Sequence, residues 1–198
     1  MTSPAVRSAS RDEESTVSAL ITLAFASDPM ARWSLRDPQT YLAVMPDLIR
    51  AFGSAAYDSD SAYVSDGFGG AAMWLPPGEE PDVEMLDRLV RTHADPTILP
   101  DVEAVFEAMA GYHPETPHWY LPLVGVDPAR QGQGIGGALM QHALAHCDRD
   151  GVAAYLESSN PRNIPLYRRY GFEILGTIQF GSSPVLTPML RPPQPVAG

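Results

Sequence analysis

A glycine-rich turn at residues 131–137, Gln-Gly-Gln-Gly-Ile-Gly-Gly, constrains this chain more than any other feature. The apolar run at residues 119–126 predicts a strand before the turn, and the pattern after it predicts a helix through about Asp148. Glycines let the backbone approach an anion closely, and the free N–H groups at a helix start point at it with the dipole's help. The turn therefore predicts a strand–turn–helix unit that can hold a pyrophosphate almost without side chains.

The charge balance limits the classes of partner. The 198 residues include 13 Lys+Arg against 24 Asp+Glu, a net charge of -11, and every basic residue is an arginine. Nucleic-acid binding needs a basic face, which this composition does not easily supply, so we expect no nucleic-acid partner. An acidic surface favours a cationic partner by steering, although acidity also serves solubility. Both explanations of the acidity stay open.

Size and apolar content predict a soluble globular chain. With 44% hydrophobic residues, it is expected to form one compact domain or a closely joined pair of halves. No apolar run approaches the roughly 18 to 20 residues of a membrane helix, and the N-terminus does not resemble a signal peptide. The single cysteine, Cys147, excludes an internal disulfide and fits a reducing compartment. We therefore expect a cytoplasmic protein with no membrane partner.

The N-terminal half alternates helices and short strands. The pattern predicts an opening strand within residues 5–10, then an amphipathic helix that runs from Asp12 and stops at Asp28. A second helix should follow Asp37, with Pro46 kinking or dividing it. Further strands are expected at residues 62–65 and 70–75, and further helices at residues 82–93 and 101–112. The last two helices carry no catalytic constellation, and packing beside a binding cleft is their expected role.

The segment after the glycine turn and its helix is expected to complete the sheet. The pattern predicts strands at residues 153–157, 172–180 and 185–190, and a short helix at residues 164–170. Gly171 is the expected C-terminal stop of that helix. Because Pro188 cannot donate to a ladder, the last strand should lie at a sheet edge or be bulged there.

One interpretation of the glycine turn is a dinucleotide site. Residues 132–137 satisfy the pattern G-x-G-x-x-G, and Glu157 ends the next expected strand at about the distance such a site requires. A dinucleotide fold, however, places this turn early, whereas only about sixty residues follow it here. Residues 127–130 also lengthen a connection that runs directly into the glycines of a dinucleotide fold. A nicotinamide or flavin oxidoreductase is therefore the weaker interpretation.

The other interpretation covers more of the chain. The pattern Gln131-x-x-Gly134-x-Gly136 resembles the signature of the GNAT superfamily of N-acetyltransferases, and residues 123–128 resemble that family's fourth strand. The later segment Asn160-x-x-Asn163-x-x-Leu166-Tyr167-x-x-x-Gly171-Phe172 resembles its second motif. The resemblance is close over residues 118–176. Residues 118–121 and 156–163 are similar to the branch that contains puromycin N-acetyltransferase, whose substrate is not transferable on this ground.

The resemblance implies an α/β fold of the GNAT type. Its sheet is mixed, mostly antiparallel and six- to seven-stranded, flanked by helices and splayed between strands 4 and 5. Residues 1–192 are expected to form a single acetyltransferase domain, with the acetyl-CoA motifs in residues 118–176 and a disordered tail at residues 193–198. The resemblance further implies acetyl-CoA as co-substrate and no metal. Because dimers are common among members, a homodimer is one expected assembly.

The resemblance also assigns residues to acetyl-CoA. The backbone of Val124 and Val126 is expected to pair with the pantetheine arm in the gap between the splayed strands. Arg130 adds charge near the phosphates or is simply an exposed turn residue, and Asn160 bonds the pantetheine arm or only shapes its turn. The N–H donors expected around the pyrophosphate belong to Gln131, Gly132, Gln133, Gly134, Ile135, Gly136 and Gly137.

Two side chains are expected to perform the chemistry. Tyr167 is the candidate acid that protonates the leaving thiolate, its alternative being a tyrosine packed in the core. Glu157 is the first candidate for the base that deprotonates an ammonium acceptor, its alternative being a structural carboxylate that caps the following loop. His118 and Tyr120 are fainter candidates for that base. The N–H of Val124 is expected to stabilise the oxyanion.

The acceptor pocket is expected to come from the N-terminal half, where the candidate lining residues are Phe25, Asp28, Trp33, Tyr41 and Trp74. The prediction is an acetyl-CoA-dependent N-acetyltransferase that acetylates a primary amine of a small molecule by direct attack in a ternary complex. A non-enzymatic acyl-CoA sensor is the alternative, but it would not need Tyr167. The identity of the amine stays open.

Overall fold

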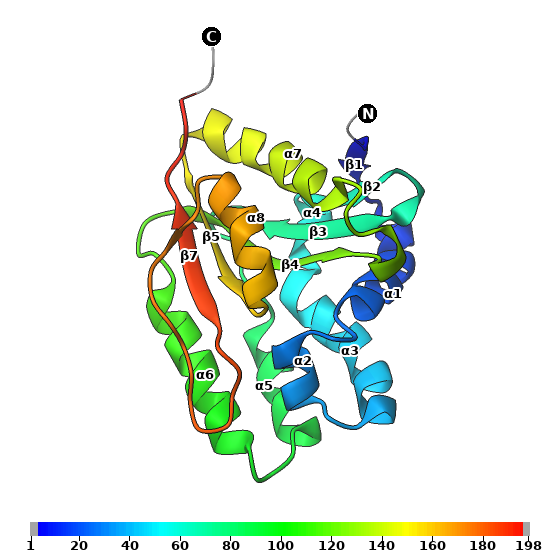
Figure 1. Ribbon diagram of the computed structural model, residues 1–198, viewed down its shortest axis with the longest axis vertical. Coiled ribbons are helices and arrows are strands. Elements are labelled where there is room, and N and C mark those ends of the chain that lie inside the picture. Colours follow the sequence, from blue (N-terminus) through cyan, green and yellow to red (C-terminus); the bar gives the residue numbers. More distant parts are fainter. Residues whose placement is uncertain (1–3, 196–198) are drawn as a thin grey trace.

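Seven strands form one mixed sheet at the centre of the computed structural model, which describes residues 4–195 (Figure 1). Their order across the sheet is β1-β2-β3-β4-β5-β7-β6. β4 and β5 run parallel, and the other neighbouring pairs are antiparallel. The strands are β1 (Val6–Ser8), β2 (Ala62–Ser65), β3 (Gly70–Leu75), β4 (His118–Val126), β5 (Ala153–Ser158), β6 (Glu173–Ile174) and β7 (Thr187–Arg191). The predicted mixed, mostly antiparallel sheet is thus confirmed.

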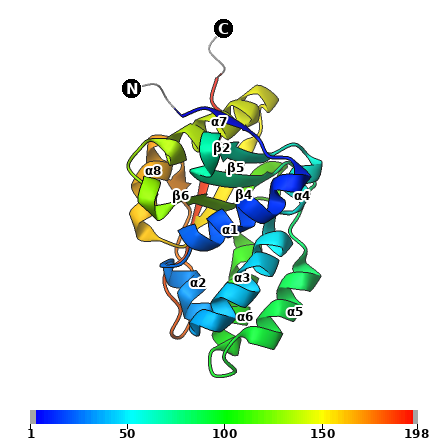
Figure 2. The same cartoon turned by 90° about the vertical axis from the view of Figure 1, so that its right-hand side faces the viewer.

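Helices cover both faces of this sheet (Figures 1 and 2). α7 and α8 pack on one face, and α1 and α3 pack against β3 and β4 on the other. The helices are α1 (Glu14–Ala24), α2 (Pro29–Ser34), α3 (Pro38–Gly53), α4 (Ala55–Asp58), α5 (Val83–His93), α6 (Leu99–Tyr112), α7 (Ile135–Asp150) and α8 (Ile164–Arg169). The sheet therefore separates two hydrophobic cores, one under α7 and one under α1 and α3.

A β-bulge in β4 changes which side chains face each core. The register pairs Met73 with Leu123 but Leu75 with Tyr120, so one residue of β3 opposes two residues of β4. The two opposing residues are Leu121 and Pro122. As a result, Tyr120 and Leu123 both face the core under α1 and α3. Without the bulge, strict alternation would place them on opposite faces.

The bulge coincides with the point at which β4 and β5 part. Their parallel pairing ends at Leu121 and Leu156. Beyond it, β4 continues to Val126 and pairs with β3, whereas β5 continues through Glu157 and pairs with β7. The splay expected between the fourth and fifth strands is therefore confirmed. One edge of each strand is left open at this place.

The helix α2 was not expected from the sequence. α1 ends at Ala24, and the Asp28 side chain then caps α2 by accepting from the N–H groups of Met30 and Ala31, each at 3.0 Å. Pro29 suits the first helical position because no N–H is needed there. The sequence pattern took Asp28 as the end of one helix, but the same residue type also begins the next one.

The two prolines singled out in the sequence both lie inside regular elements. Pro46 does not divide α3, which runs from Pro38 to Gly53, since packing of the buried face outweighs one lost hydrogen bond. Pro188 lies in β7, which is flanked by β5 and β6 rather than being an edge strand. Its carbonyl accepts from the N–H of Leu175 at 2.9 Å. The N–H and C=O of one strand residue point to the same side, so the N–H that Pro188 lacks would face the side of β6. β6 has already ended there, at Ile174.

The C-terminal segment contains fewer strand residues than predicted. β6 contains only Glu173 and Ile174, and beyond it the expected strand at residues 172–180 makes an isolated bridge from Ile178 to Leu186. In the expected tail, the N–H of Gln194 donates to Asp148, and residues 196–198 lie outside the described part of the chain. Within residues 4–195, no helix has the length and apolar character to cross a membrane. The single-domain boundaries stay a prediction.

Candidate active site

The open edge of β4 presents backbone groups beside the splay. The N–H of Asp127 donates to the carbonyl of Gly69, the residue before β3, and therefore points toward β3. Because neighbouring residues of a strand direct their N–H and C=O groups to opposite sides, Val126 and Val124 direct theirs away from β3. That side is the gap toward β5, since β5 no longer pairs with β4 there. The two valines thus lie where a pantetheine arm could pair with their backbone.

The glycine-rich turn forms the start of α7 at the end of this gap. Gly132 and Gly134 have φ of 76° and 82°, and a Cβ on either glycine would meet no atom within 4 Å. Gly134 is the N-cap of α7 and supplies no side-chain cap to the helix's first N–H groups. Ile135 is buried and anchors the turn in the core under α7. This open cradle of N–H groups fits a pyrophosphate.

Tyr170, which the sequence did not single out, fixes the first turn of α7 against α8. Its hydroxyl donates to the carbonyl of Gly137 at 2.9 Å, and a Cβ on Gly137 would lie 3.0 Å from that hydroxyl oxygen. Leu166 of α8 also approaches Gly136. A Cβ on Gly136 would be in ordinary contact with Leu166, whereas the absence of a Cβ on Gly137 permits the close approach of Tyr170. No local pattern around Tyr170 signals this contact.

Three expected ligand residues already have contacts within the protein. The Arg130 guanidinium donates to the carbonyl of Gly67 at 2.9 Å and so lies toward the turn between β2 and β3. Gln131 makes a long contact, 3.5 Å, from its amide nitrogen to the carbonyl of Val126. Asn160 uses Oδ1 to accept from the N–H of Arg162 at 3.1 Å, which is the turn-shaping alternative. The assignment of all three to acetyl-CoA stays a prediction.

Tyr167 lies on α8 and is 4% exposed. Its ring packs edge-on to Phe172, with centroids 6.1 Å apart. Burial raises the pKa of the Tyr167 hydroxyl, and the charge of Asp28 raises it further. The phenol therefore stays protonated through neutral pH, as a proton donor must. The packed ring is equally compatible with a core role, so the acid role stays a prediction.

Glu157, the residue before the last of β5, carries a buried carboxylate beside the splay. Its side chain is 3% exposed, and among the described residues its Oε1 atom has no hydrogen-bond partner. Burial raises the pKa of the Tyr120 and Tyr155 hydroxyls, and the charge of Glu157 raises both further. A buried carboxylate oxygen without a partner is costly, and such groups are concentrated at functional sites. A loop-capping role, the structural alternative, would have supplied that partner.

A histidine that the sequence did not single out lies next to this carboxylate. His113 directly follows α6, and its Nε2 atom is 3.5 Å from Oε1 of Glu157. His118, at the start of β4, approaches the same ring from the other side. The segment at residues 82–112 was expected only to pack beside a cleft. Nothing in the local sequence indicates that its last helix delivers His113 to the end of β5.

The aromatic residues proposed for the acceptor pocket are distributed over three hydrophobic clusters. Trp74 is fully buried under α7, on the face opposite Glu157, and Tyr41 donates its hydroxyl to the carbonyl of Thr22 at 2.6 Å. Phe25 is partly buried in the core under α1 and α3. Trp33 is held by a 3.0 Å bond from Nε1 to Ser182. Trp74 and Tyr41 thus serve the cores.

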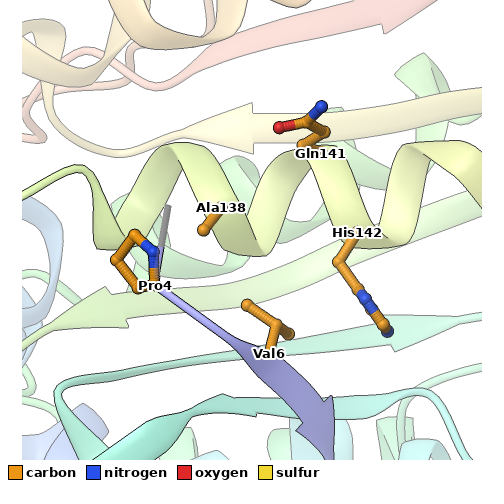
Figure 3. A pocket seen from close by; sticks show the side chains of 5 residues that line it. All are labelled: Pro4, Val6, Ala138, Gln141 and His142. Atoms are coloured by element: carbon orange, nitrogen blue, oxygen red, sulfur yellow. The ribbon is translucent and has the colours of Figure 1, made fainter. Parts of the chain in front are cut away.

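A hollow elsewhere on the surface is not part of this site. It has a volume of about 240 Å³ and lies between α7 and the N-terminal strand (Figure 3). Its lining residues are Pro4, Val6, Ala138, Gln141 and His142. None of them belongs to the glycine turn, β5 or α8. Within residues 4–195 no group of three or more histidine, cysteine or carboxylate side chains is arranged to hold a metal ion.

Comparison with protein families agrees with this geometry. A model described as the acetyltransferase (GNAT) family matches residues 72–172, which is more than half of the chain. The matched segment begins within β3 and ends at Phe172, shortly after the short helix α8. It contains the splay, the glycine turn, Glu157 and Tyr167.

The curated relatives match a shorter segment. An uncharacterized N-acetyltransferase of Schizosaccharomyces pombe is 43% identical over 54 residues, covering 27% of this chain and 22% of that protein. A mycothiol acetyltransferase of Mycolicibacterium gilvum is 43% identical over 63 residues, covering 28% and 21%. The chain thus spans about a fifth of the length of these two relatives.

Solved structures share the whole fold. A structure described as histone acetyltransferase HPA2 and related acetyltransferase, from Corynebacterium glutamicum, has a TM-score of 0.70 and 26% identity, covering 100% of both chains. A polyamine N-acetyltransferase from Drosophila melanogaster has a TM-score of 0.64 and 14% identity, covering 95% of this chain and 99% of that one. The second likeness is one of fold alone.

Proposed function

The chain belongs to the acetyltransferase (GNAT) family, and from this premise we propose that it transfers an acetyl group from acetyl-CoA to a primary amine of a small molecule. The observation that carries the proposal is the buried Glu157 carboxylate, whose Oε1 lacks a partner at the splayed end of β5. An ammonium group would satisfy that oxygen and place its proton on a base. The narrower likeness to the puromycin branch, the homodimer and the cytoplasmic location stay predictions.

Residues of the splay would hold acetyl-CoA. The turn residues Gln131, Gly132, Gln133, Gly134, Ile135, Gly136 and Gly137 would offer N–H groups to its pyrophosphate. The backbone of Val124 and Val126 would pair with its pantetheine arm, which Asn160 would also bond. When bound, acetyl-CoA supplies an activated acetyl thioester. The open left-handed glycines support this assignment, because a ligand backbone can approach them without steric conflict.

Three groups of the chain would then perform the transfer. Glu157 accepts one proton from the ammonium form of the acceptor, so that the nitrogen can attack the acetyl carbon. The N–H of Val124 donates to the acetyl oxygen as negative charge develops on it. Tyr167 donates its proton to the departing sulfur and regains one from the acetylated nitrogen or from water. For each cationic acceptor, one proton ends on sulfur and one leaves to solvent.

A cationic acceptor fits the charges near the site. Glu157 and Asp28 are both buried carboxylates, and Asp28 lies close enough to raise the pKa of Tyr167. The net charge of -11 would steer cations toward the protein and is weakened by salt. Alkylamines and arylalkylamines, which are protonated at neutral pH, are therefore the acceptors to test first. Anionic amines such as acidic amino acids should be poor acceptors.

The first test is calorimetric titration of the protein with acetyl-CoA, CoA and NADH. Binding of the two CoA species, and not of NADH, is expected. A screen of agmatine, spermidine, tyramine and puromycin, read by release of free thiol, then tests the transfer. Binding of acetyl-CoA without thiol release for any protonated amine would favour a sensor. Binding of NADH alone would overturn the proposal.

A matched pair of variants tests the base. Glu157→Gln keeps the shape of the side chain but cannot accept a proton, so turnover should fall about 100-fold or more with little change in acetyl-CoA affinity. Glu173→Gln removes an exposed carboxylate on β6 and should change neither quantity. Equal turnover in the two variants would remove Glu157 from the reaction.

A further inference from the structure

Three polar side chains from different elements form a continuous row beside the sheet. Oε1 of Glu157 lies 3.5 Å from Nε2 of His113. Nδ1 of His113 lies 3.2 Å from Nε2 of His118, and Nδ1 of His118 lies 2.9 Å from the carbonyl oxygen of Thr116. The row thus runs from the end of β5, past the end of α6, to the start of β4.

The end of the row fixes where the ring protons lie. The carbonyl of Thr116 can only accept, so Nδ1 of His118 carries a proton. A neutral His118 then presents a lone pair at Nε2, which requires a proton on Nδ1 of His113. A neutral His113 consequently presents its Nε2 lone pair to Glu157. This tautomer is the one that can receive a proton from the carboxyl group.

Exposure changes along the row in the direction a proton would have to travel. The Glu157 side chain is 3% exposed, whereas the His113 side chain is 30% exposed. The aromatic rings of Tyr120 and Tyr155 flank His113, each with its centroid 4.6 Å from that of the histidine. The titratable groups that face His113 are therefore Glu157, His118 and these two tyrosines. Both phenols are held neutral by burial and by the carboxylate charge.

We propose that His113 takes the acceptor's proton from Glu157 and releases it to solvent, while His118 holds His113 in the tautomer that this transfer requires. The proposal rests on the proposed function, because a cationic amine releases one net proton for each acetyl group it receives. A buried carboxylate that accepts this proton must lose it again before the next turnover. His113 is the group in contact with Glu157 that also reaches water.

The proton balance closes within this row. The acceptor N–H bond breaks and an O–H bond forms on Glu157; that bond then breaks as an N–H bond forms at Nε2 of His113. The imidazolium retains its Nδ1–H bond to His118 and loses the Nε2 proton to water. Glu157 and His113 return to their starting states, and no other reactant is consumed. His113 acts through Glu157, and His118 acts through His113 as a positioning residue.

The first experiment observes the rings directly and needs no acceptor. Nitrogen-15 NMR of the imidazole groups at pH 8 should show both His113 and His118 protonated at Nδ1. His118→Leu removes the acceptor for His113 and should abolish that preference in His113. His118→Gln offers an amide oxygen in place of Nε2 and should retain it. Protonation of His113 at Nε2 in the wild-type protein would overturn the proposal.

The same spectra test whether Nε2 of His113 faces Glu157. Glu157→Gln should change the nitrogen-15 chemical shift of Nε2 in His113, because an amide replaces the carboxyl group that this nitrogen faces, whereas Glu173→Gln should leave that shift unchanged. His142, which lies on α7 and packs edge-on to Tyr63, is outside the row and serves as an internal reference. An Nε2 chemical shift of His113 that is the same in all three proteins would show that this nitrogen does not face Glu157, and would overturn the relay.

The second experiment measures acetyl transfer to the best amine of the screen. His113→Gln should lower kcat about tenfold or more at pH 7, leave KM for acetyl-CoA unchanged, and recover activity as imidazole buffer is added. His142→Gln should match the wild type. A kcat loss that imidazole does not restore would assign His113 a structural role and overturn the relay. Absence of turnover in the wild type would refute the proposed function instead, and the NMR experiments would still decide the relay.

Discussion

The hydroxyl of Ser159 donates to Oδ2 of Asp28 at 2.6 Å and so ties the loop after β5 to the start of α2. The other oxygen of Asp28 caps α2 by accepting from the N–H groups of Met30 and Ala31. Asp28 is 7% exposed, so its charge is held close to Tyr167 rather than in solvent. One carboxylate therefore connects the start of α2 to the segment that follows β5.

Asp28→Ala should destabilise the protein by about 1 to 2 kcal/mol, because it removes the cap of α2. Ser159→Ala keeps that cap and loses a single hydrogen bond to a charged group, a cost of about 1.5 kcal/mol or more when the acceptor stays buried. Urea unfolding measures both. If the two changes were independent, their sum would match the double variant; we expect less than the sum, since both remove the same bond.

Tyr167→Phe should lower kcat about 100-fold and leave KM for acetyl-CoA nearly unchanged, because the hydroxyl acts only as sulfur departs. Burial raises the pKa of Tyr167, and the charge of Asp28 raises it further. Wild-type activity should therefore not decline below pH 10 through loss of the Tyr167 hydroxyl proton. Tyr170→Phe is the contrasting variant: it releases Gly137 and should raise KM for acetyl-CoA with less effect on kcat. Identical pH profiles and rates for Tyr167→Phe and the wild type would exclude the acid role.

Gly134→Asp should weaken acetyl-CoA binding about 100-fold, or 2.7 kcal/mol, by placing a negative charge in the pyrophosphate cradle. The matched control is Gly151→Asp at the other end of α7. Gly151 also has a left-handed backbone, with φ of 66°, and open space around a Cβ. The two variants should therefore share the same backbone strain. Equal acetyl-CoA affinities by calorimetry would show that the turn does not hold the phosphates.

Asp148→Asn should destabilise the protein by about 3 kcal/mol at pH 7, because it leaves the buried Arg191 unpaired. The Arg191 guanidinium lowers the pKa of Asp148, so the carboxylate contributes stability above its unfolded pKa and loses it as pH falls through the folded value. The difference in unfolding free energy between Asp148→Asn and the wild type should thus become smaller below about pH 4. Asp150→Asn, at an exposed pair, should cost about 0.5 kcal/mol or less at any pH.

Gly125→Ala should destabilise β4 against α1 by about 1 to 3 kcal/mol, since an added Cβ would lie 2.7 Å from the Cβ of Ala24. Ala24→Gly removes the opposing atom, so the double variant should recover part of the loss. Thermal unfolding of the three variants checks this. A double variant no more stable than Gly125→Ala would show that the contact is not the cause.

Local signals in the chain predicted most of the elements correctly. The strands at residues 62–65 and 70–75 have the predicted bounds, and the glycine turn begins α7 with left-handed glycines. These features follow from residues close together in the chain, such as alternation in a strand or an N–H row at a helix start. The bounds of β6 were missed because they depend on tertiary pairing. The start of α2 was missed because Asp28 follows one helix and also caps the next.

The sequence by itself determined that this chain carries a strand, a glycine turn and a helix, followed by Glu157 and Tyr167 at motif spacing. Only the tertiary structure decided which groups meet these residues. A bulge in β4 opens the sheet, Ser159 reaches Asp28, and His113 reaches Glu157. Each of these contacts joins segments far apart in the chain. Backbone propensity acts between near neighbours, whereas such contacts depend on how whole helices pack against the sheet.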